Sequence, residues 1–210
     1  MQAMSEQRHR RLETDTDAGL LVIVSGPSGV GKTTITRGVE RSIADSVFSV
    51  SVTTRPKTEA DVEGVDYHFV DDAEFDELIA DDKLIEWAEV FGCRYGTPRD
   101  WVQEQLRRGR LVILDIDVQG AVQVVKNMEG AFGLFILPPN EGVLLERLRA
   151  RKREPEEAIQ RRFAEAQREI ADARASGVYT AWVVNQDVNT AIQEAVGVIS
   201  EARSKVRKGG

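Results

Sequence analysis

The chain has 210 residues, of which 41% are hydrophobic, and a formal net charge of −7 at neutral pH. This length and composition suit a single α/β domain with a buried core, and they exclude a disordered or fibrous protein. The negative charge argues against a broad basic face for nucleic acid, no apolar run reaches the roughly 18 residues that span a bilayer, and the single Cys93 cannot form an intramolecular disulfide. We therefore expect a cytoplasmic protein with neither a nucleic-acid nor a membrane partner.

Along the chain, a polar beginning gives way to alternating strand and helix patterns. Residues 1–18 have no apolar period, which predicts a mobile tail. The alternation that follows is typical of a parallel sheet covered by helices, with strands predicted at 20–25, 48–53, 111–116, 132–137 and 180–184. Helices are expected from Lys32 to about Ser42 and over 98–108, the second with Thr97 as its cap and Pro98 at its first position.

The segment directly after the first predicted strand reads GPSGVGKT and completes the phosphate-loop pattern GxxxxGK[ST]. In such a turn the backbone N–H groups converge on phosphates, Lys32 would reach the β and γ oxygens, and the Thr33 hydroxyl would ligate Mg²⁺. The pattern predicts nucleoside triphosphate chemistry but leaves the acceptor open. The candidates for contact with the donor are Gly26, Pro27, Ser28, Gly29, Val30, Gly31, Lys32, Thr33 and Thr34.

Two segments interrupt the alternation of strands and helices. Residues 54–96 contain short strand-like pieces at 67–70 and 84–87 and a helix over 73–80, which indicates an insertion into the core. The stretch 147–162 is rich in arginine, and Pro155 marks a helix start within it. It is therefore predicted to form a helix, a loop and a second helix that can move as a lid.

Two aspartates stand at the end of the third predicted core strand. Asp115 ends its apolar run, where phosphate-loop folds place a second acidic residue near Mg²⁺. Asp117, two residues later, points to the same side of an extended strand as Asp115. It could help to hold an acceptor base or the hydration shell of the metal. It could instead cap the helix that begins at Val118.

Further motifs occur in a fixed order along the chain: Ser51–Arg55, Gly64–Val70, Glu86–Gly92, Tyr95–Thr97 and Leu114–Gly120, followed by Phe135–Pro139 and Val184–Asp187. Together with the phosphate loop they resemble guanylate kinase from Leu20 to about Ala202. The resemblance implies a phosphate-loop nucleoside monophosphate kinase with a parallel sheet core, which transfers phosphoryl groups from ATP to GMP and dGMP with Mg²⁺. The implied domain spans 19–207, with a core of 19–50, 98–146 and 163–207, a GMP-binding insertion at 51–97 and a lid at 147–162.

The base of the acceptor is the first group that the resemblance assigns to residues. Guanine presents N1–H and an exocyclic NH₂ side by side, so one carboxylate can accept from both, and the resemblance places Glu86 there and Thr97 at O6. Adenine reverses this pattern, which disfavours AMP because a buried carboxylate would face an acceptor. Thr97 could also serve only as a helix cap, and the two roles can coexist.

For the acceptor phosphate, the resemblance implies Arg55, Tyr67 and Tyr95 with Ser51 close by, although either tyrosine alone could be a half-buried strand residue. The chain departs from the family at Thr58, where a second phosphate-binding arginine is usual. We expect Lys57 to compensate as a point cation. The full GMP-binding set is Ser51, Arg55, Tyr67, Glu86, Tyr95, Thr97 and Asp117.

The arginine-rich stretch fits phosphoryl transfer, which depends on positioning and on cations rather than on a nucleophile. The resemblance selects Arg147, Arg151 and Arg162 for the lid and Asn185 for ATP, and Lys152 replaces a glycine usual in the lid turn. The catalytic set is Lys32, Arg55, Arg147, Arg151 and Arg162.

Two other functions stay open from the sequence. A non-catalytic module that uses this fold to bind protein is disfavoured by the intact Lys32, Thr33 and Asp115. A kinase for another acceptor, such as a sugar phosphate, is disfavoured by Glu86 with Thr97, but Thr58 keeps it open. The oligomeric state, monomer or homo-oligomer, is undecided.

Overall fold

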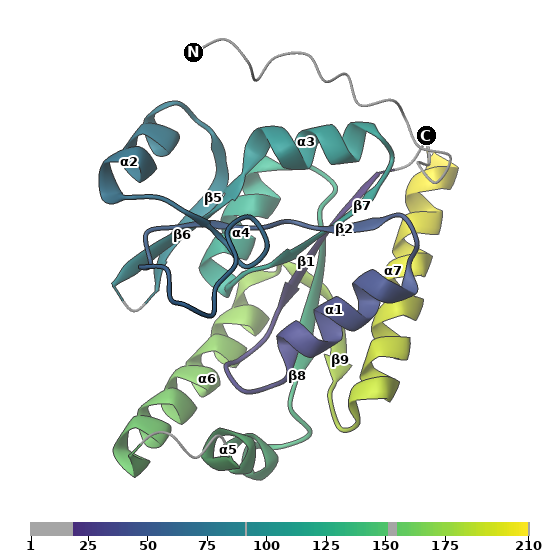
Figure 1. Cartoon of the computed structure of the whole chain (residues 1–210). Coiled ribbons are helices and arrows are strands. Elements are labelled where there is room, and N and C mark those ends of the chain that lie inside the picture. The colour runs from purple at the N-terminus through teal and green to yellow at the C-terminus, as the bar shows by residue number, and fades with distance from the viewer. Residues whose placement is uncertain (1–18, 91, 151–154, 210) are drawn as a thin grey trace.

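The computed structural model of the chain describes residues 19–90, 92–150 and 155–209 and shows two sheets flanked by helices (Figure 1). The predicted tail at 1–18 and residues 151–154 of the predicted lid, among them Arg151 and Lys152, lie outside the described residues. The strands are β1 (Leu20–Ser25), β2 (Ser46–Phe48), β3 (Val52–Thr53), β4 (His68–Phe69), β5 (Leu84–Val90), β6 (Cys93–Pro98), β7 (Leu111–Asp115), β8 (Phe132–Leu137) and β9 (Tyr179–Val184). The helices are α1 (Lys32–Ser42), α2 (Asp72–Ala80), α3 (Arg99–Arg107), α4 (Val118–Asn127), α5 (Glu141–Ala150), α6 (Glu156–Ser176) and α7 (Val188–Gly209).

The core is a five-stranded parallel sheet with the order β2-β7-β1-β8-β9. This confirms the predicted α/β class and the predicted strands at 20–25, 111–116, 132–137 and 180–184, whose ends differ from the observed ones by at most one residue. In a parallel sheet the carboxyl ends of neighbouring strands meet at one edge. The loops after β1 and β7, which carry most of the predicted donor residues, therefore lie side by side.

The prediction of one strand over 48–53 is wrong. The segment divides between two sheets, because β2 ends at Phe48 beside β7 whereas β3 begins at Val52 and pairs with β4 and β6. Both parts have extended backbone and apolar side chains, so the apolar pattern does not mark where the chain changes sheets. Ser51 consequently lies at the junction of the two sheets.

Helices cover both faces of the core sheet, and β1 is buried from both sides. On one face, Val22 and Val24 pack with residues of α1 and α7. On the other face, Leu21 and Ile23 pack with residues of α3, α4 and α6. A strand covered on both faces reads as a continuous apolar run, which is why β1 was recognisable in the sequence. None of the helices among the described residues is long and apolar enough to cross a membrane.

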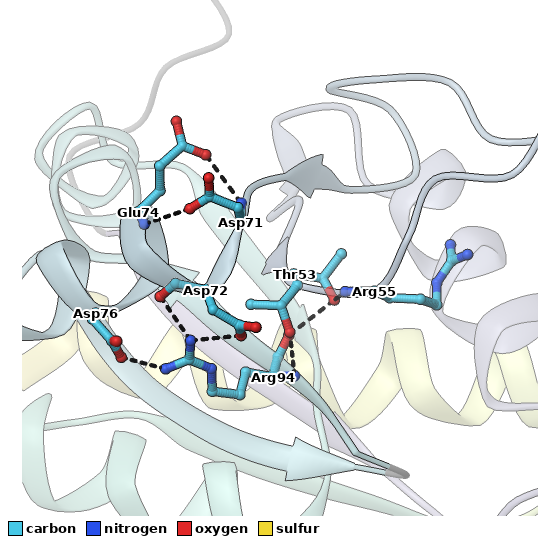
Figure 2. Close-up of polar contacts among 8 residues, drawn as sticks. Thr53, Arg55, Asp71, Asp72, Glu74, Asp76 and Arg94 are labelled. Atoms are coloured by element: carbon cyan, nitrogen blue, oxygen red, sulfur yellow. Dashed lines mark hydrogen bonds and ion pairs between the residues drawn. The ribbon is translucent and has the colours of Figure 1, made fainter.

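The segment predicted as an insertion forms the second sheet, with the order β4-β3-β6-β5, and α2 covers it. The helix begins at a capping box, in which Asp71 accepts from the Glu74 backbone and Glu74 accepts from the Asp71 backbone. Arg94 on β6 reaches the carboxylates of Asp72 and Asp76 on α2 (Figure 2). The central carbon of its guanidinium also lies 4.7 Å from the Phe75 ring centre. These contacts hold α2 against the small sheet.

The predicted helix over 98–108 is observed as α3, but its start differs. Pro98 is the residue before the first helical turn, and within the described part of the chain no side-chain hydrogen bond caps α3. Thr97 belongs to β6, and its hydroxyl donates to Glu86 Oε1 at 2.6 Å. The prediction that Thr97 caps this helix is therefore wrong, because its hydroxyl donates its hydrogen bond to a carboxylate on the neighbouring strand β5.

The predicted lid corresponds to the end of α5 and the beginning of α6. The two helices pack through Leu144, Leu148 and Ile159, and α6 continues beyond the predicted boundary until Ala173 joins the core. The small sheet with α2 and the α5–α6 pair extend from the core on either side of the loop after β1 (Figure 1). The lid boundaries and its movement stay predictions.

Candidate active site

The phosphate loop connects β1 to α1 and is anchored in the core. Val30 is completely buried among apolar residues of β1, α1 and α7. Gly29 and Gly31 have φ angles of 85° and 94°, a region that L side chains adopt rarely, so both positions favour glycine. The loop therefore holds its shape through backbone conformation and two buried residues, Pro27 and Val30, while Ser28 between them is exposed.

Three polar side chains meet at the carboxyl ends of β1 and β7. Lys32 Nζ lies 2.6 Å from Asp115 Oδ1, and Thr33 Oγ1 lies 3.4 Å from Asp115 Oδ2. Burial lowers the pKa of the Lys32 ammonium, but the ion pair with Asp115 outweighs it and leaves this pKa above its ordinary value. The donor end of the site thus holds a charged lysine.

Mg²⁺ fits the oxygen donors at this position. The ion prefers oxygen ligands and commonly takes only one or two carboxylates, with water and substrate phosphates completing its octahedron. Thr33 and Asp115 supply a hydroxyl and a carboxylate oxygen. Among the described residues no group of three His, Cys, Asp or Glu side chains could hold a metal alone. This donor set suits a metal ion that takes its remaining ligands from a bound phosphate and from water.

A single cavity of about 520 Å³ joins the phosphate loop to the second sheet. From the loop it is lined by Gly26, Pro27, Ser28, Gly29, Gly31, Lys32, Thr33 and Thr34. From the acceptor side the predicted lining residues are Ser51, Tyr67, Glu86, Tyr95 and Asp117, and Asp115 lies between the two groups. Six predicted residues with described positions do not line it: Val30, Arg55, Thr97, Arg147, Arg162 and Asn185.

Glu86 is a buried carboxylate in the wall of this cavity, with 4% of its surface exposed. Burial raises the pKa of its carboxyl to about 7, against the hydrogen bond from Thr97, and the charge of Asp117 raises it further. Because Thr97 donates its only hydroxyl hydrogen bond to Glu86, it cannot also donate to a base in this arrangement. Thr97 instead fixes the orientation of the Glu86 carboxylate.

The start of α4 packs against the same carboxylate. Asp117 accepts a hydrogen bond from the Gly120 backbone and so caps α4, as one of its two predicted alternatives requires, while it also lines the cavity. A Cβ atom built at Gly120 would lie 2.4 Å from Glu86 Oε2. The glycine therefore makes room for the carboxylate, and any larger residue would displace one of the two.

Arg55 lies behind the aromatic wall of the cavity rather than in it. Its guanidinium is bonded by both terminal nitrogens to the Asp61 carboxylate, at 3.1 and 2.8 Å, and its carbon lies 5.2 Å from the Tyr67 ring centre. Tyr67 in turn meets Tyr95 edge to face. In Figure 2 the Arg55 side chain points away from the ion pairs of Arg94. An acceptor phosphate would have to reach Arg55 past its bond to Asp61.

The loop that lacks the second arginine is organised around Asp61. Thr58 donates both its backbone N–H and its hydroxyl to Asp61 Oδ2, each at 2.7 Å. Hydrogen bonds from Arg55 and Thr58 hold the pKa of Asp61 far below its ordinary value. Lys57 Nζ lies 5.8 Å from the Phe69 ring centre and, with Arg55, lines a second, more open cavity of about 380 Å³. Its charge thus lies on the side of the loop that Arg55 occupies.

The lid arginines with described positions bind the phosphate loop from outside the cavity. Arg147 donates to the backbone oxygens of Val30 and Asn185, and Arg162 donates to Ser28 Oγ at 2.8 Å. The Asn185 amide also donates to Val30 O, at 2.7 Å, and Asn185 is buried beside the loop rather than in the cavity. Arg151 lies outside the described residues. Asn185 and Arg147 thus support the loop, and their predicted contacts with ATP stay predictions.

Sequence reasoning missed two residues of the site, Glu169 and Gly120. Glu169 on α6 lines the cavity, and its Oε2 accepts from the Ser28 backbone N–H at 3.3 Å. The available signal for Glu169 was its spacing of seven residues from Arg162, which places both on one helix face. Gly120 stood in a motif that resembled the family, but its contact with Glu86 depends on the tertiary structure.

A parallel sheet whose phosphate loop opens into a cavity shared with a small second sheet defines a phosphate-loop kinase fold. The family model for guanylate kinase matches residues 19–202. The guanylate kinase of Thermobifida fusca is 45% identical over 180 residues, covering 86% of this chain and 90% of that protein. The guanylate kinase of Gloeobacter violaceus is 51% identical over 151 residues, covering 72% and 74%. The crystal structure of guanylate kinase from Anaplasma phagocytophilum has a TM-score of 0.70 and 31% identity, covering 90% of this chain and 89% of that one. The chain belongs to the guanylate kinase family.

Proposed function

We propose that the protein transfers the γ-phosphoryl group of ATP to GMP, and to dGMP, giving ADP and GDP or dGDP in purine nucleotide metabolism. One observation carries the proposal: a single cavity joins a phosphate loop to a buried carboxylate, Glu86, on a separate sheet. A phosphate site and a site for a purine therefore face one another across one space. The composition also supports our placing the enzyme in the cytoplasm.

Glu86 selects the acceptor base in this proposal. Its Oε2 and Oε1 can accept the N1–H and NH₂ donors of guanine, and the hydrogen bond from Thr97 keeps the carboxylate in place. Adenine would bring a ring acceptor against the carboxylate, which leaves a buried charge unpaired. Because the pKa of Glu86 is raised to about 7, the carboxylate that accepts both guanine donors forms as the pH rises through this value. Asp117, which lies beside it, holds the base from the α4 side.

The acceptor phosphate lies at Tyr67, Tyr95 and Ser51, and Arg55 completes this set when its bond to Asp61 is shared or exchanged. Arginine suits the role because its planar fork meets two phosphate oxygens. Lys57 supplies the second charge on this side. The loop around Asp61 is thus the part of the acceptor site that must rearrange most.

The donor lies on the phosphate loop, where backbone N–H groups and Lys32 bind the β- and γ-phosphates. When bound, Mg²⁺ would be held by Thr33 and Asp115 and would neutralise charge on the phosphate oxygens. Lys32 exchanges its ion pair with Asp115 for the phosphates. Arg147, Arg151 and Arg162 would stabilise charge on the transferring group after the lid closes. The reaction needs no nucleophilic side chain, because an oxygen of the GMP phosphate attacks the γ-phosphorus while the bond to ADP breaks.

The test is release of ADP with ATP and Mg²⁺ against GMP, dGMP, AMP, CMP, UMP, a phosphorylated sugar and no acceptor. We expect rapid release with GMP and dGMP and little with the other acceptors. Strong release without GMP would contradict the proposal. No release with any nucleotide, combined with intact binding of GMP, would favour the non-catalytic module, and release only with a phosphorylated sugar would favour the other kinase.

A further inference from the structure

Glu169 is an ionisable residue in the donor half of the cavity that the proposed transfer does not use. It stands on α6 (Glu156–Ser176), lines the cavity and accepts a hydrogen bond from the Ser28 backbone N–H, at 3.3 Å. Ser28 belongs to the phosphate loop. A carboxylate oxygen from the lid helix thus sits on a backbone donor of the loop that should receive phosphates.

Ser28 is held by α6 at two points. Arg162 donates to the Ser28 hydroxyl at 2.8 Å, and Glu169 accepts from its backbone. The two α6 residues are seven positions apart, which is about two turns and roughly 10 Å along one face of the helix. A cation and an anion of the same helix face therefore converge on one residue of the loop.

Glu169 is one of several carboxylates that surround Lys32. Three carboxylates act on the Lys32 ammonium: Asp115 in direct contact, and Glu169 and Asp117 at longer range. Burial raises the pKa of the Glu169 carboxyl, whereas the charge of Lys32 and the hydrogen bond from Ser28 lower it. Asp115 has a place in the metal site and Asp117 caps α4. Glu169 alone of the three has no other structural or proposed chemical role.

A bound triphosphate would bring several negative charges to the same lysine and the same loop. Two anions cannot share these groups without repulsion, which is strong in a partly buried site. We propose that Glu169 is a positioning residue that competes with the phosphates of the donor for the phosphate loop, so that donor binding must displace it from Ser28. Because Arg162 stands on the same helix face, this displacement acts directly on the lid. The inference rests on the proposed function, since it takes a nucleoside triphosphate as the donor.

The test is the affinity for ATP of the full chain, measured by calorimetry without an acceptor, in the wild type, Glu169→Gln and Asp172→Asn. Glutamine keeps an oxygen that accepts from Ser28 and removes only the charge. Asp172 is an exposed residue of the same helix, so its replacement removes an equal charge elsewhere. We expect Glu169→Gln to tighten ATP binding about three- to tenfold and Asp172→Asn to change it by less than about twofold, because solvent screens exposed charges.

Two further readouts separate competition from a change in folding. The gain in Glu169→Gln should be absent for adenosine, which carries no phosphate, and it should appear both with Mg²⁺ and with a chelator. In steady-state assays the ATP KM should fall while the GMP KM stays unchanged. ATP affinity that is equal to or weaker than that of the wild type would overturn the inference. Weakening only with Mg²⁺ would also overturn it and would assign Glu169 to the hydration shell of the metal.

This outcome is distinct from a failure of the proposed function. If the wild type binds ATP and turns over GMP but Glu169→Gln binds ATP no more tightly, only the competition by Glu169 is refuted. If the wild type shows no turnover with GMP, the proposed function is refuted whatever the variant does.

Discussion

The two halves of the cavity are built in different ways. The donor half is a backbone structure: Val30 is buried in the core, and Asn185 and Arg147 both donate to its carbonyl oxygen. The acceptor half consists of side chains on a separate small sheet. Its supporting ion pairs are mostly at the surface. Arg94 pairs with Asp72 and Asp76, whose side chains are 83% and 71% exposed.

The comparison shows which interactions fix the geometry of each half. Backbone conformation and core packing fix the phosphate loop, so its geometry depends on many residues at once. Exposed ion pairs contribute only about 0–1 kcal/mol each, so the acceptor side depends on a few well-placed groups such as Glu86. Substitutions in the donor half should therefore impair the reaction itself, whereas those in the acceptor half should mainly change the affinity for GMP.

The strongest test of the comparison is Lys32→Met. Lys32 is the only side-chain cation of the phosphate-loop pattern, and in the transition state it would stabilise charge on the transferring group. We expect kcat to fall by roughly 10²–10³-fold, as for the loss of one such group in other enzymes, with a much smaller change in GMP affinity. Single-turnover assays and GMP calorimetry would measure both. A variant that keeps its kcat would remove Lys32 from the catalytic set.

The corresponding test on the acceptor side is Glu86→Gln. The amide would place a donor against one of the two donors of guanine, and a mismatched buried pair costs about 1–3 kcal/mol, so the GMP KM should rise roughly 10- to 100-fold. The ATP KM should be unchanged. A similar rise in both KM values would mean that the two halves are not independent.

Glu86→Gln should weaken GMP binding, but it should stabilise the folded protein without nucleotide at high pH. The pKa of Glu86 is raised from 4.5 to about 7 in the folded state, so its contribution to stability declines as pH rises through this interval. Above pH 7 the wild type carries a buried charge that Glu86→Gln lacks. At pH 8 the variant should unfold at a higher temperature, with up to about 3 kcal/mol gained in the free energy of unfolding, and at pH 4 the difference should vanish.

The pH dependence of GMP binding should report Glu86 directly. Only the carboxylate can accept both guanine donors, and with a pKa of about 7 it is mostly ionised at pH 8 and mostly protonated at pH 6. The affinity for GMP should therefore fall about tenfold from pH 8 to pH 6. Because the GMP phosphate itself titrates near pH 6, Glu86→Gln serves as the control. Persistence of the same step near pH 7 in this variant would assign it elsewhere.

The smallest expected effect is that of Lys57→Ala. If Lys57 replaces the charge of the arginine that is absent at Thr58, the GMP KM should rise about two- to fivefold, the size typical of a partly exposed charge contact. The kcat and the ATP KM should stay unchanged. Lys83→Ala is a matched control, because Lys83 pairs with the exposed Asp100 instead. An unchanged GMP KM would exclude the compensation.

Much of the donor half was readable from the sequence because its signals are local. The apolar run of β1, the glycine pattern and the start of α1 follow one another without interruption, and the structure has them at the predicted positions. The acceptor half was predicted through a resemblance, residue by residue. Its geometry could not be predicted in the same way, because the contacts with Asp61 and Glu86 decide where Arg55 and Thr97 direct their polar groups.

The two errors have the same physical origin. The segment 48–53 kept an extended, apolar pattern while the chain moved from one sheet to the other, and periodicity reports local conformation, not which strand lies alongside. Thr97 had the sequence context of a cap, but Glu86 competed successfully for its hydroxyl. In both cases a tertiary partner overrode a local preference.

The sequence by itself determined the parallel α/β core, the phosphate loop and the family, because these are encoded in residue spacing along one continuous segment or in an ordered series of motifs. Only the tertiary structure decided that Asp61 holds Arg55, that Gly120 makes room for Glu86 and that Glu169 meets Ser28 across 141 positions of sequence. The contacts of Gly120 and Glu169 join groups from different elements, so they depend on how the elements pack. Arg55 meets Asp61 within the irregular loop between β3 and β4, whose conformation no periodic pattern in the chain records.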